Sequence, residues 1–284
     1  MTAVHGGPAD AAQGDGVTVS GSGQDRPDAT SPPPRRRLAI PWWIPSIIGG
    51  LAIWEMAVRG FGVSELLLVP PSAIFDEFMK MLGDGMFWSH VAISTKSFLL
   101  GYGSAALAGI VLGLLLGASR VARGLFEPWI IALYATPSVA LAPLFIVALG
   151  FGVTSKAAVV ALSAFFPVII NTLAGALAVD KDLREVAIAY RATGRETFRF
   201  ILLPGSLPYI LTGLRLAVGR ALIGVVVADL FGASEGLGFM LFNAAAAFNT
   251  AGIFVVVVIL AAAGIAMSGL VGITERHFAS WKIS

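Results

Sequence analysis

Long apolar runs alternate with short polar segments along the chain from residue 38 to residue 273. Several runs last for about 20 residues, the length that a helix needs to cross the hydrocarbon core of a bilayer. The pattern predicts an all-α membrane protein with a transmembrane domain over residues 38–284. Six membrane-spanning helices are expected, over residues 38–58, 98–118, 126–149, 157–178, 209–231 and 251–273.

The polar segment between the fourth and fifth spans has its own pattern. Residues 180–199 carry nine charged side chains. Apolar residues recur at helical spacing at its start, the period breaks at Thr193–Gly194, and it resumes as far as Pro204. We therefore predict a pair of short helices at an angle, over residues 181–204, with Pro204 ending the second. The apolar positions of the first helix are Leu183, Val186, Ala187 and Tyr190.

The segments outside the spans include a tail and one more amphipathic stretch. Residues 1–34 hold six Gly and five Pro and lack aromatic residues, so they cannot bury enough apolar surface to fold. We predict a disordered cytoplasmic tail over residues 1–37, and no cleavable signal peptide, because the apolar run begins only after Arg35–Arg37. Residues 73–82 place apolar side chains at helical spacing, which predicts a helix lying on the membrane surface.

Composition narrows the function classes. Hydrophobic residues make up 57% of the chain and charged residues only 13%, about half the usual charged share. The chain has no Cys, and its three His lack the spacing of metal ligands. No hydrolase triad, phosphate loop or dinucleotide fingerprint is present. We expect a chain that is not an enzyme, with no catalytic, cofactor-binding or metal-binding residues, and its net charge of +2 argues against nucleic-acid binding.

The basic residues predict the orientation, because cytoplasmic loops of membrane proteins carry an excess of Lys and Arg. Twelve of these residues fall on one side of the predicted topology and four on the other, and residues 232–250 contain none. We therefore expect both termini in the cytoplasm. The four on the outer side are Arg59, Lys80, Lys96 and Lys156.

Glycine and proline positions predict how the spans pack and bend. Small residues recur every four positions along the second span, a ridge that lets two helix backbones approach closely. We favour packing within the chain over a subunit interface for this ridge. Pro137 and Pro143 in the third span and Pro167 in the fourth predict kinks or unwound turns. The ridge consists of Ala105, Gly109, Gly113 and Gly117.

The run from Glu185 to Pro204, EVAIAYRATGRETFRFILLP, resembles the EAA motif of ABC importer permeases, EAA-x3-G-x9-I-x-L-P. Further segments resemble the same family over about residues 38–275. They are similar to the branch that serves nitrate, sulfonate, taurine and related small anions or heterocycles. The matching motif positions are Glu185, Ala187, Ile201, Leu203 and Pro204.

The sequence departs from the family pattern at two positions. The motif's Gly falls on Arg191, which would cost about 1 kcal/mol or more if the backbone there needs a positive φ. Either the turn has moved to Gly194 or the backbone at Arg191 is ordinary helix. We favour the shifted turn, because the apolar period breaks at Thr193–Gly194. The second departure is Asp229, where the family more often has Glu.

The resemblance implies a permease subunit in a bacterial inner membrane, surrounded by lipids and without a nucleic-acid partner. Two ABC ATPase subunits would bind ATP and Mg²⁺, so this chain would hold no cofactor. A second permease copy would form a homodimer, and an extracytoplasmic solute-binding protein would deliver a small anion such as a sulfonate, taurine or nitrate. The residues implied to couple to the ATPase are Glu185, Ala187, Arg191, Gly194, Leu203 and Pro204.

Three residues are candidates for the substrate pathway: Arg220, Asn171 and Asp229. Arg220 lies in the middle of the fifth span, where an ion costs about 2.5–3.5 kcal/mol. It either meets an anionic solute or pairs with a neighbouring helix, and both interpretations stay open. Asp229 lies near the outer end of the span, where we expect it to reach water. It is about 13–14 Å along the helix from Arg220, too far for direct pairing.

Two other classes of protein are alternatives. A secondary transporter or channel that is not coupled to an ATPase often has internal repeats or an intramembrane relay of ionisable residues. The sequence shows neither feature. A membrane scaffold would use the segment over residues 181–204 for docking alone.

Overall fold

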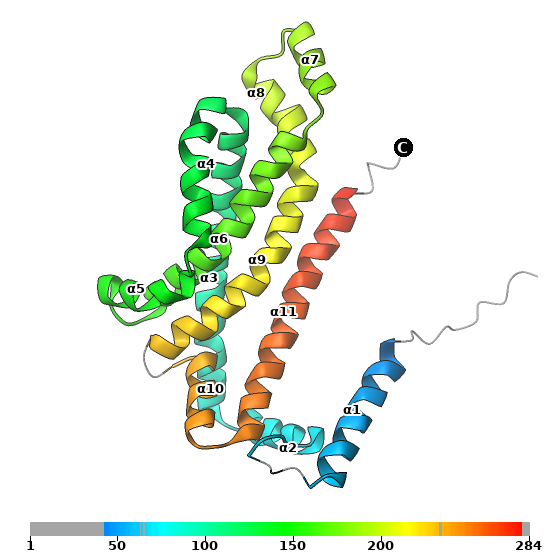
Figure 1. Ribbon diagram of the computed structural model, residues 1–284, viewed down its shortest axis with the longest axis vertical. Coiled ribbons are helices and arrows are strands. Elements are labelled where there is room, and N and C mark those ends of the chain that lie inside the picture. Colours follow the sequence, from blue (N-terminus) through cyan, green and yellow to red (C-terminus); the bar gives the residue numbers. More distant parts are fainter. Residues whose placement is uncertain (1–42, 63, 65, 233–234, 280–284) are drawn as a thin grey trace, which may run out of the picture. The chain divides into compact units, whose positions relative to one another are not determined.

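The computed structural model describes residues 43–62, 64, 66–232 and 235–279. The predicted tail over residues 1–37 lies outside these ranges, as does the beginning of the predicted first span. Ile47–Ser284 forms one compact unit, which contains every site discussed below. All regular secondary structure in the described residues is helical, which confirms the predicted all-α class (Figure 1).

The helices differ widely in length, from one turn to more than eight turns. The long helices run through the apolar segments, and the short ones form the connections between them (Figure 1). In chain order the elements are α1 Trp43–Gly60, α2 Pro71–Leu82, α3 Gly85–Ala118, α4 Arg120–Ala135, η1 Ser138–Leu141, α5 Ala142–Leu149, α6 Val153–Ala178, α7 Lys181–Ala189, α8 Gly194–Thr197, η2 Phe198–Leu202, α9 Leu203–Phe231, α10 Leu237–Ala246 and α11 Thr250–Ala279.

The membrane spans are only partly confirmed. Among the described residues, four helical segments are long and apolar enough to cross a bilayer, and α4 with Ser138–Leu149 adds a fifth if the bent pair counts as one span. These five match the second to sixth predicted spans. The described part of the predicted first span forms α1, Trp43–Gly60, which is not among these segments, so a sixth crossing and the orientation stay predictions. The four segments are Gly85–Ala118, Val153–Ala178, Gly194–Phe231 and Thr250–Thr274.

Helix α3 begins 13 residues before the predicted second span. The Asp84 side chain accepts a hydrogen bond from the Met86 N–H at 2.9 Å and caps the helix there. At 1.5 Å per residue, the 34 residues of α3 extend for about 51 Å, well beyond the ~30 Å of a hydrocarbon core. The extension places His90 and Ser94 on a helix instead of in a loop.

Helix α6 packs against α3 on one side and α9 on the other. The predicted ridge of small residues on α3 makes the first of these contacts. An added Cβ would lie 2.9 Å from the Val168 Cβ at Gly109 and 2.6 Å from the Thr172 Cβ at Gly113. Any larger side chain would separate the two helices. The predicted packing within the chain is thus confirmed for this ridge.

The predicted break in the third span is confirmed at Pro137. Helix α4 ends at Ala135, and the segment Ser138–Leu149 continues at 85° to it. Pro143 lies in the first turn of α5, where its missing N–H leaves no helical bond unmade. Pro167 lies inside α6, which continues through it. Of the three prolines expected to distort their helices, only Pro137 stands at a break.

The prediction that Pro204 ends a helix is wrong. Helix α8 runs through the π-helical turn Phe198–Leu202 directly into α9, so that Gly194–Phe231 is one continuous helical segment. In an α-helix the Pro204 ring would clash with the carbonyl four residues earlier. The wider π turn, in which the Leu203 N–H donates to the Phe198 carbonyl, accommodates the ring.

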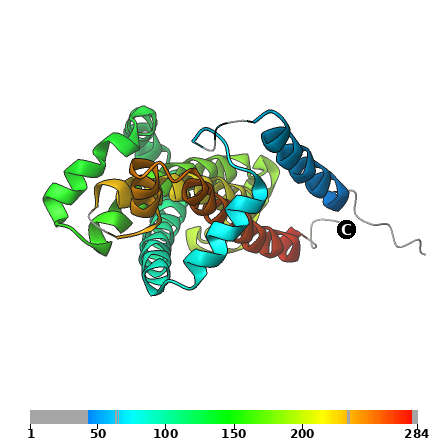
Figure 2. The same ribbon diagram turned by 90° about the horizontal axis from the view of Figure 1, so that it is seen from below.

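Helix α2 is the predicted amphipathic helix and lies crosswise to α11 (Figures 1 and 2). The Asn249 Nδ2, just before α11, donates to the Glu77 Oε1 of α2 at 2.9 Å. Phe75 and Met79 on α2 are exposed. These observations confirm the helix, and its position on the membrane surface stays a prediction.

Candidate functional site

The segment between α6 and α9, residues 180–202, forms an angled projection that we call the elbow (Figure 1). Both of its short helices have capped N-termini. The Asp180 Oδ1 accepts from the Asp182 N–H at 3.0 Å. The Thr193 N–H donates to the Glu196 Oε2 at 2.7 Å and the Glu196 N–H donates to the Thr193 Oγ1 at 3.3 Å, a complete capping box. The bond from the Thr193 N–H, followed by that from its hydroxyl, lowers the pKa of Glu196.

Arg191 ends α7 in the left-handed conformation, with a φ of 54°. Its N–H donates to the Ile188 carbonyl at 2.9 Å, and the Ala192 N–H donates to the Ala187 carbonyl at 2.8 Å. These bonds form a Schellman motif, in which the left-handed residue is usually Gly. Gly194 begins α8 instead, so the expected shift of the turn to Gly194 is wrong. The alternative of ordinary helix at Arg191 is wrong as well, and the left-handed Arg costs about 1–2 kcal/mol.

Helix α7 exposes apolar side chains although it lies outside the apolar spans. The exposed fractions are 52% for Leu183, 52% for Val186 and 84% for Tyr190, while Ala187 is buried. Exposed apolar side chains that share one helix face often mark a contact with another protein. The base of the elbow is fixed, because Leu202 is buried in a cluster with residues of α3, α6 and α9.

The predicted coupling residues do not all lie together. Glu185, Ala187 and Arg191 belong to α7 and its terminal turn, and Gly194 is the first residue of α8. Leu203 and Pro204 belong to the first turn of α9, on the far side of the π turn. The elbow therefore contains the first four of these residues, and the last two continue its helix toward the membrane-spanning part of α9.

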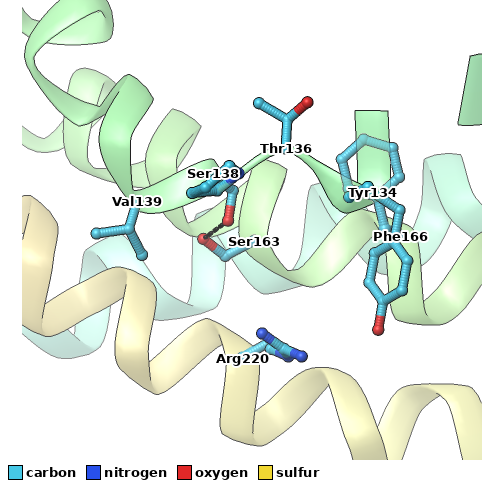
Figure 3. A pocket seen from close by; sticks show the side chains of 9 residues that line it. Tyr134, Thr136, Ser138, Val139, Ser163, Phe166 and Arg220 are labelled. Atoms are coloured by element: carbon cyan, nitrogen blue, oxygen red, sulfur yellow. Dashed lines mark hydrogen bonds between the residues drawn. The ribbon is translucent and has the colours of Figure 1, made fainter. Parts of the chain in front are cut away.

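The break between α4 and α5 forms one wall of a cavity of about 280 Å³ (Figure 3). Arg220 of α9 lies across this cavity from Ser138 and Ser163, whose Oγ atoms are 3.5 Å apart. Within the described part of the chain, Arg220 makes no hydrogen bond or ion pair. The cavity residues are Tyr134, Ala135, Thr136, Pro137, Ser138, Val139, Ser163, Phe166 and Arg220.

Of the three predicted pathway residues, only Arg220 lines this cavity. The Asn171 Nδ2 donates to the Pro167 carbonyl at 2.8 Å, and Asn171 lies where α6 meets Gly213 of α9. Asp229 is completely buried near the end of α9, so the expectation that it reaches water is wrong. Asp229 stays buried because it forms an ion pair with Lys156, which was not predicted from the sequence.

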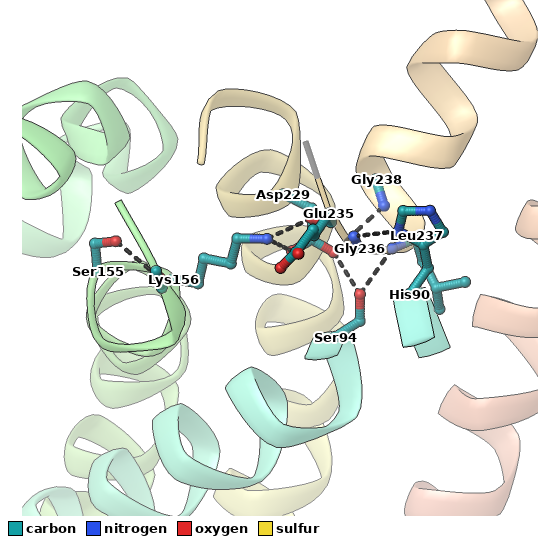
Figure 4. A network of polar contacts seen from close by, with 10 residues as sticks. His90, Ser94, Ser155, Lys156, Asp229, Glu235, Gly236, Leu237 and Gly238 are labelled. Atoms are coloured by element: carbon teal, nitrogen blue, oxygen red, sulfur yellow. Dashed lines mark hydrogen bonds and ion pairs between the residues drawn. The ribbon is translucent and has the colours of Figure 1, made fainter. Parts of the chain in front are cut away.

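Lys156 of α6 forms a buried ion pair with Asp229 of α9 (Figure 4). The Lys156 Nζ lies 2.9 Å from the Asp229 Oδ1, and the side chains are 2% and 0% exposed. Lys156 also donates to the Glu235 carbonyl. The Ser94 hydroxyl donates to the Asp229 Oδ2 at 2.5 Å. A buried charge is tolerated when it is paired and hydrogen-bonded in this way.

The turn between α9 and α10 closes over this ion pair (Figure 4). The N–H groups of Gly236, Leu237 and Gly238 donate to the His90 Nδ1, the Ser94 Oγ and the Asp229 Oδ2, at 2.8, 2.8 and 3.3 Å. Gly236 has a φ of 114°, which side-chain-bearing residues avoid. We call the set Lys156, Asp229, Ser94, His90 and Gly236–Gly238 the latch, since it joins α3, α6 and α9 to this turn.

Sequence reasoning placed Lys156 only as a marker of the outer side, and missed its pairing. A signal was available, because Lys156 stands just before the predicted fourth span and Asp229 just before the end of the fifth. Antiparallel spans bring such ends to the same level, and a charge near a span needs a partner. His90 and Ser94 offered no comparable signal, because they preceded the predicted second span.

Long apolar helices in close contact, one of them broken beside a cavity with a cation, define a multi-pass membrane protein suited to transport. Residues 107–280 match the family described as "Binding-protein-dependent transport system inner membrane component". The chain belongs to this family. The resemblance to ABC importer permeases is thereby confirmed, and with it the branch that includes sulfonate, taurine and nitrate permeases.

Individual relatives cover most of the chain. It is 35% identical to the Bacillus subtilis protein named as aliphatic sulfonates transport permease SsuC, over 85% of this chain and 87% of the relative. It is 36% identical to the taurine transport system permease protein TauC of Escherichia coli, over 69% and 75%. It is 32% identical to the formylaminopyrimidine transport permease protein ThiX of Halalkalibacterium halodurans, over 82% and 92%.

A solved structure has a similar fold. It is titled "Crystal structure of an amino acid ABC transporter with histidines", and it matches with a TM-score of 0.56 over 68% of this chain and 94% of that chain. The sequence identity is 18%. The match supports the helical fold of a transport permease and carries no information about the solute of this protein.

Proposed function

We propose that this chain is the transmembrane permease subunit of an ATP-driven importer for a small anion, such as a sulfonate, taurine or nitrate. The solute would arrive on an extracytoplasmic binding protein. Membership of the binding-protein-dependent family supports the transport role. The relatives named for aliphatic sulfonates and taurine support the class of solute.

The observation that carries the proposal is the elbow. Its helices are capped, its base is packed into the long helices, and α7 presents Leu183, Val186 and Tyr190 to the surroundings. An amphipathic helix of this kind suits a groove on a soluble partner, with apolar side chains filling the groove and rim charges setting the register. We assign that partner as an ABC ATPase, two copies of which would bind ATP and Mg²⁺.

The proposal includes an arrangement in the membrane. Six spans would place both termini and the elbow in the bacterial cytoplasm, as the distribution of Lys and Arg predicts. A second copy of the chain would complete a homodimeric pathway. Arg220 is retained as a pathway residue, because it lines a cavity and has no acceptor among the described residues. Pathway roles for Asn171 and Asp229 stay predictions.

The test is to purify the chain with candidate ATPase and binding-protein partners and to measure ATP hydrolysis with and without solute. An importer subunit should bind an ATPase and support solute-dependent hydrolysis. A secondary transporter would depend on an ion gradient, and a scaffold would bind without turnover. Either result would contradict the proposal.

A matched pair of variants locates the contact. Val186→Asp on α7 should abolish binding of the ATPase, because it places a carboxylate on the apolar face. Val121→Asp on α4 changes a Val outside the elbow that is even more exposed, 74% against 52%, and should leave binding intact. Equal loss in both variants would argue against the elbow as the contact.

A further inference from the structure

We infer that the cavity beside Arg220 binds the anionic head of an organic sulfonate, with its carbon chain against Tyr134 and Phe166. This inference rests on the proposed function and adds a site and an orientation for the solute within the permease. Three features of the cavity carry it: an unpartnered guanidinium, a pair of hydroxyl groups and an aromatic wall.

The Arg220 guanidinium has no opposite charge beside it among the described residues. No described carboxylate lies within ion-pairing distance of Arg220, whereas the buried Lys156 is paired with Asp229. Arg220 also lies one helical turn before Gly224, whose added Cβ would lie 3.1 Å from the Ser163 Oγ. The side of α9 that carries Arg220 therefore faces α6. A guanidinium binds oxyanions through two parallel N–H bonds, which suits a sulfonate.

The hydroxyl pair Ser138 and Ser163 supplies one free donor on the opposite side of the cavity from Arg220 (Figure 3). The Ser163 hydroxyl donates to the Val159 carbonyl at 3.0 Å, which leaves Ser163 as an acceptor for Ser138. The Ser138 hydroxyl can exchange that long 3.5 Å contact for a bond to an anion. An oxyanion between Arg220 and Ser138 would have donors on two sides.

The aromatic side chains of the cavity provide an apolar surface for the carbon chain of the solute. Tyr134 and Phe166 have ring centroids 6.0 Å apart at an interplanar angle of 48°, and both line the cavity. The cavity volume of about 280 Å³ lies just below the ~300–1,000 Å³ range of ligand pockets. Such a space fits one small organic anion better than a bare inorganic ion or a large solute.

The absence of Cys from the chain allows a direct chemical test. In the purified importer complex, Ser138→Cys would be the only thiol of this chain, and Thr154→Cys would serve as an exposed control on α6. Each variant is treated with two methanethiosulfonate reagents, one carrying a sulfonatoethyl group and one a trimethylammonioethyl group. The ratio of the two reaction rates cancels differences in thiol reactivity between the sites.

We expect the anionic-to-cationic rate ratio at Ser138→Cys to exceed that at Thr154→Cys by on the order of tenfold, since a fixed cation nearby acts on the two reagents in opposite directions. Adding Arg220→Gln should lower the ratio to that of the control. Arg220→Lys should keep most of it. An unchanged ratio in the Arg220→Gln background would overturn the inference, provided that size-exclusion chromatography shows an intact complex.

Protection experiments test the orientation of the solute. Butane-1-sulfonate should slow the labelling of Ser138→Cys at a roughly tenfold or more lower concentration than methanesulfonate, because its extra CH₂ groups would be buried. Phe166→Ala should remove this difference while the charge preference remains. Equal protection by both sulfonates would refute the aromatic contact.

The outcomes separate the site from the proposed function. Loss of solute-dependent ATP hydrolysis with intact charge preference would reject the importer role and keep the anion site. Coupled hydrolysis without any charge preference at Ser138→Cys would keep the importer and reject the site.

Discussion

Breaking the ion pair of the latch should destabilise the protein more than removing any exposed charged side chain. In Lys156→Met the side-chain length is nearly kept, but the Asp229 carboxylate loses its cation while it stays completely buried. Removing one partner of a buried pair costs about 3–5 kcal/mol, because the remaining charge is left uncompensated. For a chain of this size, a loss of that order corresponds to a fall in Tm of roughly 10 °C.

The double variant Lys156→Met/Asp229→Asn makes the prediction specific to the pair. An Asn side-chain oxygen can still accept from the Ser94 hydroxyl and the Gly238 N–H, so the two hydrogen bonds of the Asp229 Oδ2 can be kept. No uncompensated charge then remains. The double variant should recover about 2 kcal/mol or more relative to the sum of the single changes.

The assay is thermal unfolding of the detergent-purified protein, followed by tryptophan fluorescence and by loss of the monodisperse chromatographic peak. Lys96→Met is the matched control, because Lys96 is an exposed lysine on α3 and its removal should cost within about 0.5 kcal/mol. If the effects of Lys156→Met and Asp229→Asn simply add in the double variant, the two side chains are not energetically coupled and the reasoning fails.

Three further predictions concern other parts of the fold. Arg191→Gly should slow amide exchange in α7 by relieving a left-handed Arg, a gain of about 1 kcal/mol, whereas Arg191→Ala should give no such gain. Gly113→Ala should lower the Tm by forcing α3 away from α6, while Gly103→Ala on the same helix, with open space around its added Cβ, should leave it equal or higher. The lowered pKa of Glu196 means that its capping bond stabilises α8 fully above the ordinary Glu pKa of about 4.5 and is lost as the pH falls through the folded-state pKa. Exchange in α8, corrected for intrinsic rates, should therefore rise in acid, and Glu196→Gln should remove this pH dependence.

The sequence predicted those parts of the fold that depend on the hydrophobicity and size of regularly spaced side chains. Apolar runs of bilayer length predicted α3, α6, α9 and α11, and a four-residue repeat of small side chains predicted the ridge that meets α6. Start positions were less predictable. Helix α3 begins 13 residues before the predicted span, in a stretch of mixed apolar and polar residues, because Asp84 caps it there, and hydropathy alone does not register a cap.

The elbow shows why local rules can mislead. A broken apolar period at Thr193–Gly194 and a Gly at that place suggested a shifted turn, yet the left-handed residue is Arg191. The hydrogen bonds of the Schellman motif and the capping box at Thr193 fix where α7 ends and α8 begins, so the backbone accepts strain at Arg191. Arg191 thus adopts the left-handed conformation that a Gly at the motif position would favour.

Because the helix continues through Pro204, the elbow, Arg220 and Asp229 lie along one helical segment, which the sequence did not predict. Gly194–Phe231 is a continuous helical segment of 38 residues, about 57 Å long at 1.5 Å per residue. It begins in the elbow, carries Arg220 about two-thirds of the way along and has Asp229 near its end. Coupling between distant sites travels through rigid elements of this kind. At the far end the latch ties this segment to α3 and α6. From α8 onward the chain is helical as far as the cavity, and Arg220 lies between the elbow and the end that the ion pair holds. A displacement of α7 itself reaches this segment through the turn at residues 190–193.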